Sequence, residues 1–148
     1  MILYTIGYTK KSLKEFITCL QDAGIDAVID VRLRNTSQLA GFSKRDDLAF
    51  SLEVGFGMAY EHRPDMAPTA EILDAYKRDE DWSAYERAFL RLLEERAAER
   101  MGKQLLTTYQ RPCLLCAEPM PDHCHRRLVA EYLAERLVDW GIDIIHLI

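Results

Sequence analysis

The chain carries no excess of basic residues. Its 148 residues include 24 Asp and Glu against 19 Lys and Arg, which gives a net charge of −5 at pH 7. A general nucleic-acid scaffold normally has a basic excess, so this balance argues against that class of protein while leaving room for a local basic pocket. The first residues, from Met1 to Thr5, show no charged lead and no long apolar run. We therefore expect neither a signal peptide nor a membrane-spanning segment.

Cysteine is scarce as well, with four residues in the chain. Without an export signal, this number indicates reduced thiols in the cytoplasm and not a disulfide framework. The sequence also lacks internal repeats, low-complexity tracts and a domain linker. Because 49% of the residues are hydrophobic and 29% are charged, these absences predict one globular domain over residues 1–148 with a substantial core.

Two phosphate-binding motifs are missing. A phosphatase loop needs an arginine six positions after its cysteine, but Asp122 stands at that distance from Cys116 and Ala130 at that distance from Cys124. No glycine-rich phosphate loop is present either. An anion site in this chain must therefore be built from other residues.

The apolar periodicity predicts strands and helices in alternation. The expected strands cover residues 1–6, 27–31, 58–62, 112–117 and 143–147. Ser12 to Glu15 fit a capping box that opens a helix ending at Gly24, and Thr69 is expected to cap a helix through Tyr76. Further helices are expected over 46–53, from Trp82 onward, and from an N-cap at Asp122 to Gly141. Strand, helix and strand within the first 31 residues give a parallel pair with a right-handed crossover. The predicted fold class is α/β: a mostly parallel sheet of about five strands with helices on both faces.

This topology predicts where a site would lie. In a parallel sheet the carboxyl ends of all strands meet at one edge, where ligands bind. Residues that lie far apart in the sequence should then converge on the start of the last long helix. They are Tyr8, Asp30, Arg32, His62, Cys116 and Glu118 from strand ends, and Cys124, His125 and Arg126 from the helix.

Cys124 is the first candidate for chemistry. It is expected in the first turn of its helix, where free backbone N–H groups and the helix dipole favour negative charge. A thiol there can have a lowered pKa and act as a nucleophile, a redox group or a metal ligand. Arg126 can hold the charge of that thiol or a ligand anion. The alternative is a semi-buried cysteine with an ordinary thiol.

Cys113 and Cys116 have an odd spacing on one strand, which places their side chains on opposite faces of the sheet. This argues against a zinc knuckle or a thioredoxin-type pair. We expect Cys113 to pack in the core, whereas Cys116 either packs there or belongs to the site. Glu118, just beyond the strand, is a candidate general base, metal ligand or partner of Arg32 or Arg126, with a structural ion pair as the alternative.

Asp30 and Arg32 lie two residues apart on one strand end and share a face. A buried carboxylate requires a partner, and we expect Arg126 or a backbone turn to supply it for Asp30. Arg32 is then free to bind a phosphate or carboxylate in bidentate fashion. Ser37 and Lys44 extend the anion contacts along the same loop, unless that loop is only solvated.

His125 is expected either to serve as an acid/base or ligand group or to form a local hydrogen bond at the helix start. A metal site made by Cys116, Cys124, His125 and Glu118 is a further alternative. Against it, adjacent residues on a helix point about 100° apart, so Cys124 and His125 should not easily ligate one ion together.

These motifs resemble the domain-of-unknown-function 488 family of small bacterial and archaeal proteins, over nearly the whole chain. The resemblance implies a fold and a site but no reaction. Family members often carry a proline shortly after Asp-Val-Arg, where this chain has Asn35, so we expect a differently shaped loop. The matching stretches are Cys116-Ala117-Glu118 with Cys124-His125-Arg126, Thr5 to Tyr8, Asp30 to Arg32 with Ser37, and Phe42 with Lys44.

The leading hypothesis is a domain that binds a small anionic ligand, with a phosphate, a carboxylate or a nucleotide as examples. Cys124, Glu118 and Cys116 would then supply any catalysis, and the sequence leaves open whether there is any. The first alternative is a zinc- or iron-binding domain that uses Cys116 and Cys124. The second is a non-catalytic module that binds nucleic acid or a protein through residues 32–45.

Overall fold

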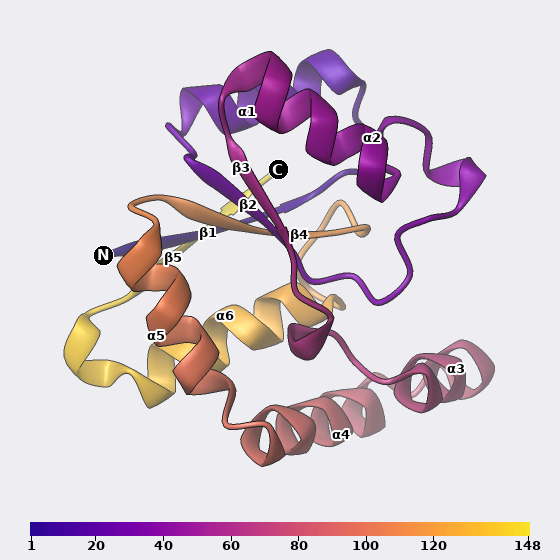
Figure 1. Ribbon diagram of the computed structural model, residues 1–148. Helices are drawn as coiled ribbons and strands as arrows, with labels where there is room; N and C mark the ends of the chain where they lie inside the picture. The colour runs from indigo at the N-terminus through magenta and orange to yellow at the C-terminus, as the bar shows by residue number, and fades with distance from the viewer.

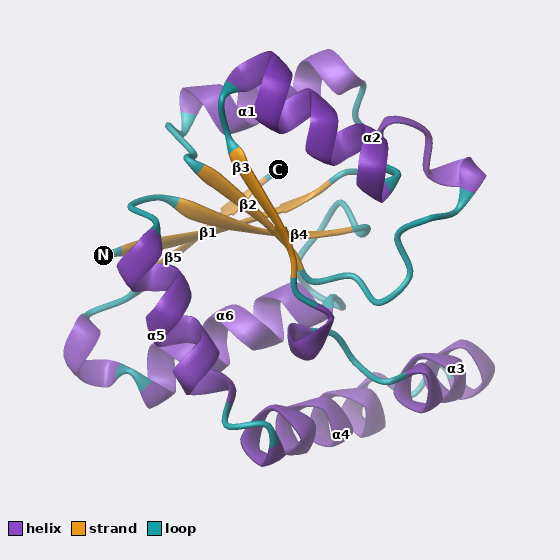
Figure 2. Ribbon diagram, in the orientation of Figure 1, coloured by secondary structure: helices purple, strands orange, loops and turns teal.

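A computed structural model describes the backbone of residues 1–148 and the side chains of all except residues 38 and 39. Five strands form one parallel sheet in the order β3-β2-β4-β1-β5, which confirms the predicted α/β class (Figures 1 and 2). The strands are β1 (Ile2–Gly7), β2 (Ala27–Asp30), β3 (Ala59–His62), β4 (Pro112–Cys116) and β5 (Asp143–Leu147).

Helices cover both faces of the sheet (Figure 1). They are α1 (Leu13–Asp22), α2 (Arg45–Phe50), α3 (Ala70–Asp79), α4 (Trp82–Glu95), α5 (Ala98–Thr108) and α6 (His125–Arg136). Short helical turns are η1 (Gln38–Ser43), η2 (Ser51–Gly55), η3 (Pro64–Met66) and η4 (Val138–Trp140). In the described part of the chain, no helix combines the length and apolar character needed to cross a bilayer.

Each face of the sheet carries its own apolar layer. On one face, Phe16 and Leu20 of α1 and Leu48 of α2 pack against strand residues that include Val28 and Cys113. The layer on the other face is formed by helices α4, α5 and α6 against β1, β2 and β4. Its fully buried members include Phe89, Leu93, Leu114, Val129 and Leu133. The expected core position of Cys113 is confirmed, and the alternation of β4 directs the side chain of Cys116 to the opposite face.

Several helix starts follow from local sequence. Ser12 and Glu15 form the predicted capping box at α1, because each side chain accepts a hydrogen bond from the other residue's backbone N–H, at 3.1 and 3.2 Å. Thr69 caps α3 as predicted. The break between α4 and α5 was not predicted: it lies at Ala97, which adopts a left-handed backbone with φ of 51°. Neither glycine nor proline marks that position.

The predicted N-cap of the last long helix was wrong. The helix begins three residues after Asp122, at His125, and its N-cap is Cys124. A turn closed by the hydrogen bond from Cys124 N to Pro121 O, at 3.2 Å, delays the start. Cys124 consequently has an extended backbone, with φ −138° and ψ 135°, instead of a helical one.

Candidate functional site

A cavity of about 340 Å³ opens at the carboxyl edge of the sheet; we call it the edge cavity. It lies where the predicted strand ends meet the start of α6. Its lining residues come from the ends of β1, β2 and β4, from α3 and α4, and from the segment that leads into α6. They are Tyr8, Arg32, Leu33, Arg34, Leu73, Tyr76, Lys77, Trp82, Tyr85, Cys116, Ala117, Glu118, His123, Cys124 and His125.

Three buried side chains with sulfur or nitrogen atoms meet at the base of the edge cavity. Cys116 Sγ, Cys124 Sγ and a ring nitrogen of His125 all lie within 4.8 Å of one another. The expectation that Cys124 and His125 point apart was therefore wrong. It assumed two helical residues, whereas the extended backbone of Cys124 directs its side chain to the same point as that of His125.

The ring of His125 is held in one orientation. Its Nε2 lies 2.6 Å from the carbonyl oxygen of Val31. A carbonyl can only accept, so Nε2 carries the proton, and the neutral ring leaves the lone pair of Nδ1 free. Burial lowers the pKa of His125 and favours this neutral form. Nδ1 lies 3.6 Å from Cys116 Sγ, so the free lone pair faces the sulfur cluster.

The two cysteines of the cluster differ in the charge that their surroundings favour. A hydrogen bond from the Cys124 thiol lowers the pKa of Cys116, with help from the backbone N–H groups of Ala117 and Glu118 and the charge of Arg126, against the cost of burial. The same hydrogen bond and burial raise the pKa of Cys124. Cys116, and not Cys124 as the sequence suggested, is therefore the better place for a negative charge.

Arg126 is fully buried, and the contacts of its guanidinium are all within the protein. Its nitrogens donate to the carbonyl oxygens of Glu118 and Pro119, to Thr5 Oγ1 and to Cys124 Sγ, the last at 3.4 Å. None of these partners is a carboxylate, and Cys124 Sγ is the partner that belongs to the sulfur cluster. Direct anion binding by Arg126 stays a prediction. Its contacts show that it positions the loop after β4.

Of the two partners expected for Asp30, Arg126 does not pair with it, but the backbone turn is present: the backbone N–H of Arg32 donates to Asp30 Oδ1 at 3.1 Å. Arg32, two residues along, donates from Nε and Nη2 to the two carboxylate oxygens of Asp30, both at 2.8 Å. Tyr60 and Asn35 also donate to Asp30. Burial opposes the charged form, but Arg32, Tyr60 and Asn35 outweigh it and hold the pKa of Asp30 below its usual value.

Asn35 explains the departure from the family pattern. Its side chain is buried and donates to Asp30 Oδ2 at 3.1 Å, while its carbonyl oxygen accepts from the backbone N–H of Arg45 at 2.8 Å. A proline at this position has no side-chain donor and could not make the first of these bonds. Asn35, noted in the sequence only as a departure from the family pattern, thus ties the loop after β2 to the buried carboxylate of Asp30.

The structure separates the other predicted site residues into two groups. Tyr8 and Glu118 line the edge cavity, and the Tyr8 ring lies 5.2 Å from the Arg32 guanidinium. Ser37 and Lys44 do not line it in the described part of the chain, and Lys44 pairs with Asp47 at the start of α2. Their predicted anion contacts stay predictions.

Sequence reasoning missed the aromatic wall of the edge cavity. Trp82 stacks between Tyr85 and His123, with both ring centroids 4.9 Å from its own. The sequence predicts Trp82 only as a helix start and does not place His123 in the site. No local signal joins them, because they are 41 positions apart and meet only through the packing of α4 beside the segment before α6.

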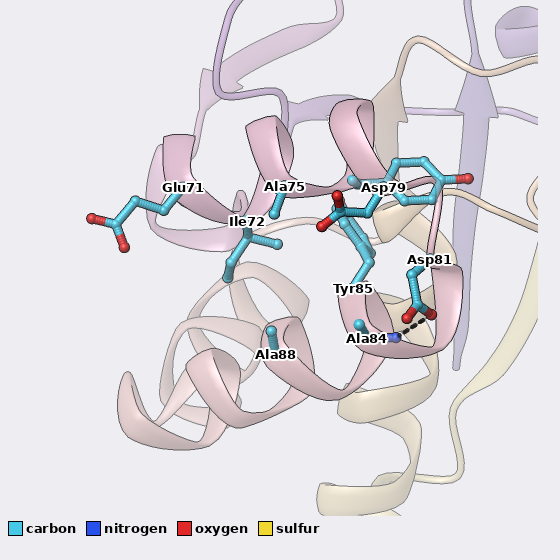
Figure 3. A pocket seen from close by; sticks show the side chains of 9 residues that line it. Glu71, Ile72, Ala75, Asp79, Asp81, Ala84, Tyr85 and Ala88 are labelled. Atoms are coloured by element: carbon cyan, nitrogen blue, oxygen red, sulfur yellow. Dashed lines mark hydrogen bonds between the residues drawn. The ribbon is translucent and has the colours of Figure 1, made fainter.

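A second cavity, of about 270 Å³, lies between α3 and α4; we call it the α3–α4 cavity. Figure 3 shows Ile72 and Ala75 of α3 facing Ala84 and Ala88 of α4 across it, with Asp81 bonded to the Ala84 N–H. Its ionisable lining groups are carboxylates and tyrosines: Glu71, Asp79, Asp81, Tyr76 and Tyr85. No cysteine, histidine, lysine or arginine is among the described residues that line it, so it offers no soft ligand and no cation.

The sequence of the chain matches one known protein family. The family model described as "Domain of unknown function DUF488" matches residues 12–133 of the 148-residue chain. The chain belongs to this family. No curated protein and no solved structure matches it. The match spans the sulfur and imidazole cluster, so the residues of the edge cavity other than Tyr8 lie within the family's own segment.

Proposed function

We propose that the edge cavity binds a small organic anion with a phosphate or carboxylate group. The observation that supports this is a local reversal of charge. Three cationic side chains line the cavity, Arg32, Arg34 and Lys77, whereas Glu118 is the sole carboxylate among its described lining residues. The chain as a whole carries a net charge of −5.

The three cations differ in how free they are to meet a ligand. Arg32 is paired with Asp30, and Arg34 with Asp74 at 3.2 Å on the surface. Lys77 forms no ion pair with any residue that the structure describes. Lys77 is therefore the cation that gains most from a ligand anion, because Asp30 already balances the charge of Arg32.

The rest of the cavity suits an organic molecule better than a bare inorganic ion. Its volume of about 340 Å³ is at the lower end of the range for small-molecule sites. Leu33, Leu73, Tyr76, Trp82 and Tyr85 provide apolar and aromatic walls. The same lining includes groups that can act on a bound ligand: Glu118 as a base, and Cys116 or Cys124 as a nucleophile.

The cations of residues 32–45 give less support to a nucleic-acid module. Each has a carboxylate partner: Arg32 with Asp30, Arg34 with Asp74, Lys44 with Asp47, and Arg45 with Asp46. A surface that binds a phosphate backbone needs cations that can exchange counterions for phosphates. Binding of nucleic acid or of a protein through this loop stays a prediction from the sequence.

Calorimetric titration with phosphate, pyrophosphate, citrate and adenosine monophosphate tests the proposal. At least one organic anion should bind and change the fluorescence of Trp82. Lys77→Gln should weaken that binding by about threefold to tenfold, because an exposed charged contact contributes about 1 kcal/mol. The control is Arg78→Gln, which removes the neighbouring cation outside the cavity. Equal affinities for the two variants, or no binding of any of these anions, would contradict the proposal.

A further inference from the structure

We propose that Cys116, Cys124 and His125 together hold one zinc ion, with its fourth coordination position open to the edge cavity. Zinc binds cysteine sulfur and histidine nitrogen, and three protein ligands with one open position are typical of sites that act on a ligand. All three residues are buried and all three line the cavity, so a ligand in the cavity reaches the fourth position directly.

The spacing of the three atoms fits a tetrahedral ion. Zn–S bonds of about 2.3 Å and Zn–N bonds of about 2.0–2.1 Å separate a sulfur and a nitrogen ligand by roughly 3.6 Å in a tetrahedron. The distance between Cys116 Sγ and His125 Nδ1 is 3.6 Å. Cys124 Sγ lies within 4.8 Å of Cys116 Sγ and of a ring nitrogen of His125, so a small rotation of one side chain brings all three atoms to bonding distance of one point.

The surroundings match those of metal ligands. A ligating histidine usually donates its second N–H to a carbonyl or carboxylate, which fixes the tautomer. His125 does this with Val31, at 2.6 Å, and presents Nδ1 to Cys116 Sγ at 3.6 Å. Arg126 donates to Cys124 Sγ at 3.4 Å, and such N–H groups stabilise thiolates that bind metal.

The charges also explain how an anion can approach the sulfurs. A ligand anion would be repelled by a thiolate at the base of the cavity. Two thiolates, one guanidinium from Arg126 and one Zn²⁺ sum to a single positive charge, which an incoming anion neutralises. The metal therefore stands between the sulfurs and the anionic group. This role of the fourth position rests on the proposed anion function, whereas the three-ligand site does not.

Cobalt titration of the full chain tests the inference. The reduced protein, stripped with a chelator, is titrated with Co²⁺ alone. It should take up about one ion per chain, with thiolate-to-cobalt charge-transfer absorption and tetrahedral d–d bands that Zn²⁺ abolishes. Cys124→Ser should weaken uptake by more than the roughly tenfold to hundredfold that outer-shell changes cost. Cys19→Ser, on α1 and half-buried, is the control and should bind like the unmodified chain.

Absence of thiolate–cobalt absorption from the stripped chain, or equal uptake by Cys124→Ser and Cys19→Ser, would overturn the metal site. If Cys124→Ser does not fold, the titration of the unmodified chain decides alone. Lys77→Gln separates this inference from the anion proposal. It should leave cobalt uptake unchanged but reduce the shift that adenosine monophosphate causes in the d–d bands. Anion binding without cobalt uptake would refute the metal site alone, and cobalt uptake without any anion effect would refute the anion function alone.

Discussion

The edge cavity and the α3–α4 cavity are neighbours that share Tyr76 and Tyr85, yet most of their other lining residues differ in chemistry. The edge cavity has cations, two cysteines and two histidines in its lining, whereas the α3–α4 cavity is lined by carboxylates, alanines and an isoleucine. One lies where strand ends converge on a helix start, and the other lies between two helices that are neighbours in sequence.

This difference shows what the parallel sheet contributes. Between α3 and α4, only local side chains can meet, so the cavity there is a product of helix packing. At the sheet edge, segments far apart in the sequence meet: the hydrogen bond from His125 to Val31 spans 94 positions, and the one from Arg126 to Thr5 spans 121. Buried polar groups there satisfy one another, and no buried side-chain nitrogen or oxygen in the described residues lacks a hydrogen-bond partner.

The largest expected effect comes from crowding the wall of the edge cavity. A Cβ on Gly7 would lie 1.6 Å from the carbonyl oxygen of Glu118, so Gly7→Ala must displace the loop after β4. We expect a loss of about 3 kcal/mol or more in the free energy of unfolding, measured by urea denaturation, together with loss of cobalt uptake. Gly55→Ala, where an added Cβ meets nothing within 4 Å, should change stability by less than about 0.5 kcal/mol. Similar losses for both would show that the loop after β4 is not tightly held.

The next effect comes from removing the buried cation. Arg126→Met replaces the guanidinium with an apolar group on a similarly unbranched side chain. The carbonyl oxygens of Glu118 and Pro119 then lose the hydrogen bonds that Arg126 donates to them. We expect the free energy of unfolding to fall by about 2–4 kcal/mol, again in urea. The neighbouring Arg127, which pairs with Glu131 near the surface, supplies the control: Arg127→Met should cost less than about 1 kcal/mol. If the two substitutions cost the same, Arg126 does not organise the site.

A smaller effect is expected in the α3–α4 cavity. Asp81 accepts from the Ala84 N–H at 3.1 Å and caps α4, so Asp81→Ala should cost about 1 kcal/mol in thermal or urea unfolding. Cobalt uptake and anion affinity at the edge cavity should not change, because Asp81 does not line it. A clear loss of either would mean that the two cavities act as one site.

Much of the fold followed from local patterns. The capping box at Ser12, the cap at Thr69 and the strand over 143–147 were predicted from short sequence signals, and the structure has them. The convergence of strand ends on Cys124 and His125 also followed, since a parallel topology requires it. The left-handed residue Ala97 did not, because no residue type there signals a break.

The side-chain contacts within the site could not be predicted, because local sequence patterns do not determine them. The turn from Pro121 to Cys124 moved the N-cap by two residues, from the predicted Asp122 to Cys124, and thereby turned Cys124 towards the ring of His125. The partner of Asp30 was misjudged because Arg32 folds back along its own strand end, a rotamer that the sequence cannot specify. Trp82 and His123 meet only after α4 has packed beside the segment before α6.

The most direct test of a functional sulfur site at the sheet edge is residue-resolved alkylation of the cysteines in the reduced native chain. The chain is first stripped of metal and then loaded with zinc. Cys113 and Cys116 lie three residues apart on β4, but only Cys116 reaches the edge cavity. We predict that Cys116 and Cys124 are modified in the stripped protein and protected by zinc, while Cys113 is unreactive in both. Equally slow modification of Cys113, Cys116 and Cys124, unaffected by zinc, would contradict a functional sulfur site at the sheet edge.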